Sequence, residues 1–327
     1  MINRRDLLQG AAALATATSF SALRAQTPAF PNRPLQLTVA FAPGGAGDLI
    51  ARRIAKEMSA FLGQAVVIEN RPAPTVGVQA VARAKPDGHS MMMVGNGTTL
   101  ASALFAKVPY RLVKDFSHVS TMAFFDVALV VDSASSFASV GDVLAYARAN
   151  PGKMNIATVR VGSTQHLTAS MFTAMTGIEA TLVPFKTTGD ILSALRNRDV
   201  HVAFEIVPPI LGQITSKLVR PLATTAARRS PRLPQVPTLQ EAGIAGFEIA
   251  SWNGISVPAS TPRPIVDRLA QAVHAAATNP EVQRELLALG VEARSSTPDE
   301  MTRRVQSEIA NWGAVIDRLG IERQKGF

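Results

Sequence analysis

Apolar positions along the chain alternate between strand-like runs and helical spacing. Residues 35–41 form a β-rich run that ends at a Pro-Gly-Gly turn, and from Asp48 apolar residues recur every three or four positions until Gly63. Short apolar runs at 65–68 and 90–94 follow. A strand, a helix and another strand in this order form a βαβ unit, which predicts a parallel sheet covered by helices.

The same rhythm begins again in the middle of the chain. A predicted strand at 155–159 leads into a helix that carries Leu167 and ends at Gly177. Predicted strands at 180–183 and 200–204 follow, with helical spacing between them. We interpret this second series as a second α/β lobe.

The last third of the chain is mainly helical. Pro264 opens one predicted helix, and residues 297–300 form a capping box in front of another. We expect both helices to pack on the sheet of the first lobe, with a ligand cleft at the carboxyl ends of the strands. The predicted fold is therefore α/β and two-lobed, each lobe a mixed or parallel sheet flanked by helices: lobe 1 comprises 26–124 plus 229–327, and lobe 2 comprises 125–228.

Residues 1–25 have the features of an export signal. Arg4 and Arg5 precede a weakly apolar stretch at 10–23, and a small residue, Ala25, stands at the expected cleavage point. The stretch is shorter than the roughly 20 apolar residues that span a bilayer. We expect cleavage and a periplasmic location, and the sequence leaves both the twin-arginine and the ordinary secretory route open.

Charge and composition narrow the ligand class. The whole chain has a formal charge of +9, and removal of residues 1–25 leaves +7, from 30 basic and 23 acidic residues. The basic residues are dispersed and aromatic residues make up only 6%, which argues against a nucleic-acid groove and favours an anionic small molecule. The chain has no cysteine, and its five histidines lack metal-ligand spacing, so we expect no metal site and no cofactor.

Two loops of small residues, each between a strand and a helix, are candidates for binding that anion. The first, at 43–48, has the sequence Pro-Gly-Gly-Ala-Gly-Asp, in which backbone N–H groups and a helix N-terminus can approach a carboxylate closely. It lacks the endings of a P-loop and of a dinucleotide fingerprint, and it also fits a simple turn with Asp48 as helix cap. The second, at 160–166, places Ser163 and Thr164 beside Gly162. Facing each other, the loops could hold both ends of a dicarboxylate.

A catalytic alternative uses Ser163 as nucleophile and His166 as base. No acidic residue stands at a spacing that completes a triad, and the Gly-x-Ser-x-Gly motif is absent because Gln165 occupies the second glycine position. We therefore expect a binding protein rather than an enzyme, and keep an exported serine hydrolase as the weaker alternative.

The chain resembles the substrate-binding proteins of tripartite tricarboxylate transporters, also called Bug receptors. The similarity covers essentially the whole chain after the export signal and rests on an ordered set of short motifs. These are Phe30-Pro31-Asn32-Arg33-Pro34, Pro43-Gly44-Gly45-x-x-Asp48, Glu69-Asn70-Arg71-Pro72, Lys85-Pro86-Asp87-Gly88-His89, Lys114-Asp115-Phe116, Gly162-Ser163-x-x-His166-Leu167, Val183-Pro184-Phe185-Lys186, Leu233-Pro234-Gln235-Val236-Pro237-Thr238, Glu241-Ala242-Gly243 and Trp252-Asn253-Gly254.

The resemblance implies a type II periplasmic binding protein that closes on a small organic carboxylate, mainly through backbone amides of the two loops. It implies membrane transporter subunits as partners, with a membrane sensor kinase as the alternative, and we expect a monomer. Carried over to this chain, the implied ligand-binding residues are Gly44, Gly45, Ala46, Asp48, Gly162, Ser163, Thr164 and Gln165, with Asn96 and Thr98 on a further loop at the cleft edge.

Some positions depart from the family pattern. Phe185 replaces a usual tyrosine, Thr187 replaces a glycine, and His201 stands where an aspartate is common. A ligand amino group would then find no anion at this end. The departures favour a simple or aromatic carboxylate over an amino acid.

Overall fold

The computed structural model describes residues 30–40, 43, 45–71, 74–318 and 320–323, so the expected export signal lies outside the described residues. The chain begins with three parallel strands. β1 (Leu35–Val39) pairs with β2 (Val66–Asn70) on one side and with β3 (Ser90–Gly95) on the other. The spatial order β2-β1-β3 places the carboxyl ends of all three strands at one edge.

A second parallel trio repeats this arrangement. β5 (Met154–Val159) pairs with β6 (Ala180–Phe185) and with β7 (Val202–Ile206), which gives the order β6-β5-β7. In each trio the first strand in the sequence is the central one. The helices that follow the central strands, α2 (Ala46–Leu62) and α7 (Thr164–Thr176), therefore begin at equivalent positions.

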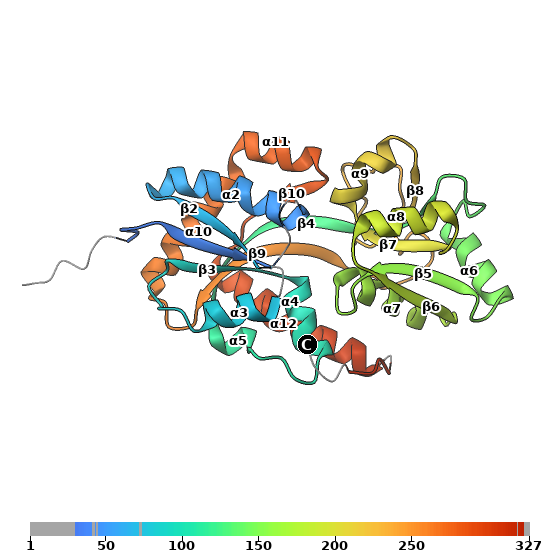
Figure 1. Cartoon of the computed structure of the whole chain (residues 1–327), viewed down its shortest axis with the longest axis horizontal. Helices are drawn as coiled ribbons and strands as arrows, with labels where there is room; N and C mark the ends of the chain where they lie inside the picture. The colour runs from blue at the N-terminus through green and yellow to red at the C-terminus, as the bar shows by residue number, and fades with distance from the viewer. Residues whose placement is uncertain (1–29, 41–42, 44, 72–73, 319, 324–327) are drawn as a thin grey trace, which may run out of the picture. The chain divides into compact units, whose positions relative to one another are not determined.

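One long strand, β4 (Phe116–Asp132), joins the two trios (Figure 1). The first part of β4 pairs antiparallel with β9 (Ala250–Pro258) and with β10 (Val291–Ala293). β9 in turn pairs with β3. The second part of β4 pairs antiparallel with β7 and with β8 (Val219–Thr224). The strands thus form one ten-stranded mixed sheet, and from Arg33 onward the chain is one compact unit, so the division into two lobes stays a prediction.

Helices complete the fold, and the two long C-terminal ones lie where the sequence predicts. α10 (Arg263–Thr278) packs on α2 and β4, and α12 (Pro298–Arg318) packs on α4 (Asn96–Leu104) and β4. The remaining helical bounds are α3 (Pro74–Ala82), α5 (Leu112–Asp115), α6 (Val140–Ala149), α8 (Thr188–Asn197), α9 (Val207–Thr215) and α11 (Pro280–Ala288).

Local sequence signals set several of these boundaries as predicted. Gly63 and Gly177 end α2 and α7 in the left-handed region, at φ 69° and 65°. The capping box forms before α12: the Thr297 N–H donates to a Glu300 oxygen over 2.8 Å, and the Glu300 N–H donates to the Thr297 hydroxyl over 3.2 Å. The predicted α/β fold with mixed sheets and flanking helices is confirmed.

One core cluster extends across the shared strand β4. It joins Leu100 and Leu104 of α4 to Leu129 of β4, and it includes the ring pair Phe172 and Phe204, whose centroids lie 5.4 Å apart. Apolar burial of this kind is the main stabilising contribution to the fold. It fixes the start of α7 against the sheet.

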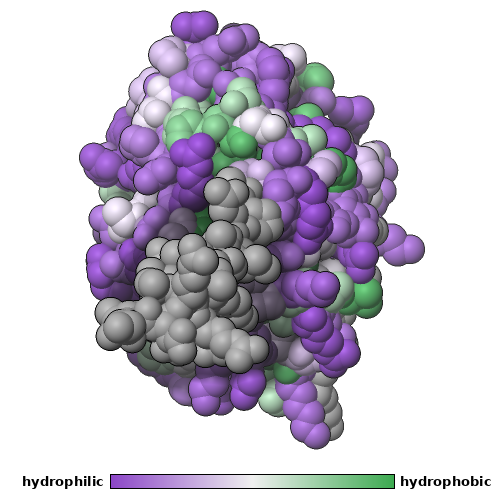
Figure 2. Space-filling model, turned by 90° about the vertical axis from the view of Figure 1, so that its left-hand side faces the viewer, coloured by the Kyte–Doolittle hydropathy of each residue, from purple (hydrophilic) through white to green (hydrophobic). Residues whose placement is uncertain are grey.

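Hydrophilic residues predominate on the face shown in Figure 2, and hydrophobic ones occur there in small scattered groups. Such isolated apolar residues are normal on protein surfaces. Among the described residues, no helix has both the length and the apolar character needed to cross a membrane.

Candidate functional site

The candidate loops follow the central strands of the two parallel trios. In open α/β sheets, ligands bind outside the carboxyl ends of the strands, where neighbouring connections leave in opposite directions. The orders β2-β1-β3 and β6-β5-β7 place such a point after β1 and after β5. The chain regions that lead into α2 and α7 therefore occupy equivalent positions in the two trios, which makes both of them candidates for ligand binding.

In the first loop, Gly45 is the N-cap of α2, in an extended conformation with φ −71° and ψ 163°. No side chain caps this helix start, and the Gly45 carbonyl accepts from the Leu49 N–H over 3.0 Å. Because the first N–H groups of a helix have no partner within the helix, those at Ala46 and Gly47 could bond an external acceptor. Gly44 lies outside the described residues.

The Asp48 carboxylate forms hydrogen bonds within the protein. It is buried, with Oδ1 accepting from Asn70 Nδ2 over 2.8 Å and Oδ2 accepting from Arg52 Nε over 2.9 Å. Arg52 also donates to Asn70 Oδ1 over 3.1 Å. This cluster fastens the start of α2 to the end of β2. Asp48 is the third residue of the helix and Gly45 is the N-cap, so the alternative in which Asp48 caps α2 was wrong.

In the second loop, Ser163 is the N-cap of α7. Its hydroxyl donates to the Val159 carbonyl over 3.0 Å and accepts from the His166 N–H over 3.1 Å, and its own N–H donates to the Arg160 carbonyl over 3.1 Å. Ser163 thus serves the loop itself. The N–H groups of Thr164 and Gln165, in the first turn of α7, stay available for an external acceptor.

The structure does not form the serine–histidine pair that a hydrolase would need. Ser163 bonds the backbone N–H of His166, and ring atom Nδ1 of His166 is buried without a hydrogen-bond partner among the described residues. Burial lowers the pKa of His166. His166 therefore belongs to the first turn of α7 and does not activate Ser163.

Gly162 brings the second loop against α4. Its φ of 80° lies in the left-handed region, and a Cβ at this position would stand 2.9 Å from Cε2 of Phe105, the residue that ends α4. Only glycine fits both the backbone angle and the ring. The second loop and the helix that carries Asn96 and Thr98 are therefore in direct contact.

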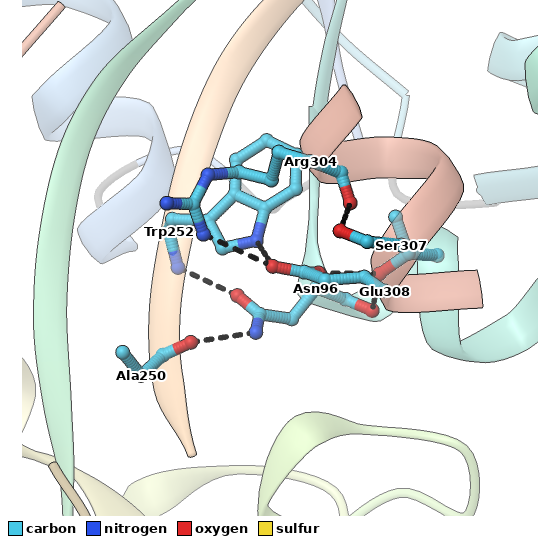
Figure 3. A network of polar contacts seen from close by, with 7 residues as sticks. Asn96, Ala250, Trp252, Arg304, Ser307 and Glu308 are labelled. Carbon is cyan, nitrogen blue, oxygen red and sulfur yellow. Dashed lines mark hydrogen bonds and ion pairs between the residues drawn. The ribbon is translucent and has the colours of Figure 1, made fainter. Parts of the chain in front are cut away.

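The side chains of Asn96, which Figure 3 shows, and of Thr98 form hydrogen bonds within the protein. The Asn96 side chain accepts from the Trp252 N–H over 2.6 Å and donates to the Ala250 carbonyl over 2.7 Å. The Thr98 hydroxyl accepts from the Gly95 N–H over 2.9 Å and donates to the Gly95 carbonyl over 2.6 Å. These bonds fasten the start of α4 to β9 and to the end of β3.

The same network continues to a buried carboxyl group, Glu308 of α12 (Figure 3). Trp252 Nε1 donates to Glu308 Oε1 over 2.6 Å, Thr99 Oγ1 donates to Oε2 over 3.1 Å, and Arg304 donates to Oε1 over 3.2 Å. Burial raises the pKa of Glu308. The network braces the first trio behind the candidate site.

Sequence reasoning missed Glu205, a buried acid at the end of β7. Its Oε1 accepts from Gln165 Nε2 over 2.7 Å and from the Ile206 N–H over 2.8 Å, and its Oε2 accepts from Thr188 Oγ1 over 3.0 Å. The side chain is 1% exposed, and burial raises its pKa. A glutamate within the apolar run Val-Ala-Phe-Glu-Ile was the available signal.

His201 lies at the opposite edge of the sheet from Glu205. It precedes β7 and contacts the Tyr146 hydroxyl at 3.1 Å through Nε2, while its Nδ1 accepts from the Asn155 N–H over 3.1 Å. The replacement of an aspartate by His201 therefore does not change the charge beside the candidate loops. The acidic group behind the second loop is Glu205.

The described part of the chain also has cavities away from these loops. One of about 940 Å³ is lined by Ile214, Arg220 and Val236, and the candidate loop residues are not among its walls. The candidate site is therefore defined by its helix starts and their N–H groups.

Comparisons with known proteins identify the family of this chain and agree with its fold. A protein of Pseudomonas sp. (strain P51) described as "UPF0065 protein in tcbD-tcbE intergenic region" is 35% identical over 96% of this chain and 94% of its own length, and BugT of Bordetella pertussis is 30% identical over 94% and 95%. The solved structure of Rpa4515 from R. palustris with adipate has a TM-score of 0.82 and 33% identity, and covers 91% of this chain and 100% of its own.

MatC (Rpa3494) from Rhodopseudomonas palustris, solved with bound malate, has a TM-score of 0.79 and 32% identity, and covers 88% of this chain and 100% of its own. Residues 50–321 match the family described as "Tripartite tricarboxylate transporter family receptor". The chain therefore belongs to the tripartite tricarboxylate transporter receptor family, which includes the Bug proteins.

Proposed function

We propose that the protein is a periplasmic solute-binding protein. It captures a small carboxylate-containing ligand in a cleft between two lobes, closes on it by a hinge motion, and delivers it to a tripartite tricarboxylate-type transporter. The protein reaches the periplasm through a cleavable signal at residues 1–25 and acts as a monomer without catalysis.

One observation carries this proposal: α2 and α7 begin at equivalent points of two similar strand trios, each with N–H groups open to an external acceptor. Helix starts favour negative charge through these N–H groups and the helix dipole. A ligand that accepts hydrogen bonds from the first turns of both α2 and α7 binds most tightly when both helices are close to it. Such a ligand stabilises a closed form because only that form supplies every contact.

Backbone bonds near the predicted lobe boundary support a hinge there. The Thr225 N–H donates to the Val127 carbonyl over 2.9 Å, and the Ile249 N–H donates to the Thr225 carbonyl over 2.8 Å. The Thr225 hydroxyl donates to the Ile249 carbonyl over 2.6 Å. The two segments that cross between the predicted lobes are thus bonded to each other and to the segment before β9, and small φ/ψ changes beside them would swing one lobe against the other.

The relatives support the ligand class and the partner. Solved relatives hold adipate and malate, which are small carboxylates. The family description names a transporter receptor, which favours transport over signalling to a sensor kinase. The internal bonds of Ser163 argue against the hydrolase alternative.

A thermal-shift screen with mono-, di- and aromatic carboxylates tests the proposal. A true ligand at 100 times its dissociation constant stabilises the folded protein by about 2.7 kcal/mol. Gly45→Leu should abolish this stabilisation. Absence of a shift with every carboxylate, or an equal shift in Gly45→Leu, would contradict the proposal.

A further inference from the structure

Glu205 places a buried carboxylate behind the second loop, where three helices begin. Its hydrogen-bond donors come from the first turn of α7 (Gln165), from the first residue of α8 (Thr188) and from the N-cap of α9 (Ile206). All three groups donate to it, and these bonds favour the ionised carboxylate against the rise in pKa that burial causes. A negative charge of the protein thus already occupies the position that these helix starts favour.

The two loops differ in how their buried acids are compensated. Asp48, behind the first loop, pairs with Arg52 over 2.9 Å. Among the ion pairs recorded for the described residues, none includes Glu205. Arg160 and Lys186 follow the adjoining strands β5 and β6, but both are exposed, so water and salt screen their charges.

A buried charge that has no ion-pair partner acts over a longer distance than an exposed one, because few solvent molecules screen it. Gln165 bonds Glu205 directly and lies in the helical turn that offers N–H groups to the ligand. A second carboxylate that docked on this turn would therefore lie one side chain away from the charge of Glu205. At the first loop the penalty is smaller, because Arg52 bonds the buried Asp48 carboxylate directly.

We propose that Glu205 determines ligand specificity: it directs the carboxylate of the ligand to the first loop and selects against a second carboxylate at the second loop. This inference rests on the proposed function. The protein would then prefer monocarboxylates whose far end is uncharged over dicarboxylates of the same length.

Hexanoate and adipate test this, because they have the same six-carbon chain and differ by one terminal carboxylate. Calorimetry with the full protein should give tighter binding of hexanoate, by about tenfold or more. Glu205→Gln, which keeps the shape of the side chain, should shift the ratio of the two dissociation constants about tenfold toward adipate. Glu179→Gln removes an equal charge from an exposed position before β6, at the opposite edge of the sheet, and should leave the ratio unchanged.

Tighter binding of adipate than of hexanoate by the wild-type protein would overturn the inference. Equal ratios of the two dissociation constants in Glu205→Gln and Glu179→Gln would also overturn it. The proposed function would survive both results. If the wild-type protein binds no carboxylate of the wider screen, the proposed function fails and the inference with it. Should Glu205→Gln not fold, as seen by circular dichroism, the wild-type ratio alone decides.

Discussion

The ring of Phe105, at the end of α4, occupies the space in which a side chain on Gly162 would stand. Their closest approach, from a Cβ built on Gly162 to Cε2 of Phe105, is 2.9 Å. The contact ties the loop that opens α7 to the helix that follows β3. It sets the position of the second loop relative to the first trio.

Gly162→Ala should therefore destabilise the protein and weaken ligand binding. The left-handed backbone costs an alanine about 1–2 kcal/mol, and the methyl group would also displace Phe105. Gly152→Ala is a matched control, because its φ is 72° and nothing lies within 4 Å of the added Cβ. Thermal unfolding should show a loss in both variants, and calorimetry should show weaker binding in Gly162→Ala only. Equal binding in the two variants would mean that the Phe105 contact does not position the loop.

Asn96→Ala should lower stability because it removes both bonds to β9. The buried Trp252 N–H and the Ala250 carbonyl would lose their side-chain partner, at a cost of about 2 kcal/mol or more. Urea unfolding measures the loss, with the exposed Asn197→Ala as control. An unchanged free energy of unfolding, together with weaker ligand binding, would instead make Asn96 a ligand contact.

Gly45→Leu should abolish carboxylate binding while leaving stability nearly unchanged. Gly45 has an extended backbone at φ −71°, which any residue can adopt, so the added side chain acts by blocking approach to the N–H groups. Gly313→Leu adds the same volume on α12, where no atom lies within 4 Å of the new Cβ. Calorimetry should show no carboxylate binding by Gly45→Leu and unchanged affinity in Gly313→Leu. Full affinity in Gly45→Leu would remove the first loop from the site.

Stability should fall as the pH drops from 6.5 toward 4, in part because of His118. Burial lowers the pKa of His118 to about 4, from an ordinary value of 6.5. Since the unfolded chain takes up the proton first, the stability contribution is complete above 6.5 and is lost as the pH falls toward the folded value. The loss near pH 4 is on the order of 3 kcal/mol.

Denaturant unfolding across this pH range measures that loss. The His118→Asn variant should lack this part of the decline, whereas the exposed His274→Asn should retain it. A decline of equal size in His118→Asn would show that other groups cause it.

Sequence patterns predicted the elements whose signals are local. The capping box at 297–300 and the glycines at 63 and 177 act within a few residues, and each marks a helix end in the structure. The repeated strand–helix rhythm likewise predicted both loops. In contrast, β9 pairs with strands that lie more than 100 residues earlier in the chain. No local sequence signal therefore predicts its place between β3 and β4.

The roles of side chains in the candidate site were harder to predict than its loops. Asp48 also fitted a helix cap, but Gly45 is the N-cap and the Asp48 carboxylate accepts from Asn70, 22 residues later in the chain. Its role as a ligand contact stays a prediction. Ser163 uses its hydroxyl inside its own loop. Glu205 follows His201 by four residues, and the first residues of β7 lie between them. The direction of β7 puts Glu205 at the carboxyl ends of the strands, beside the second loop, and His201 at the opposite ends.

A structure of the protein with a carboxylate selected by the thermal-shift screen tests the central claim most directly. The account predicts that a ligand oxygen lies about 3 Å from backbone nitrogens at 45–47 while the ligand also contacts the first turn of α7 at 164–165. A ligand held by one loop alone, or bound in the cavity beside Arg220, would contradict it.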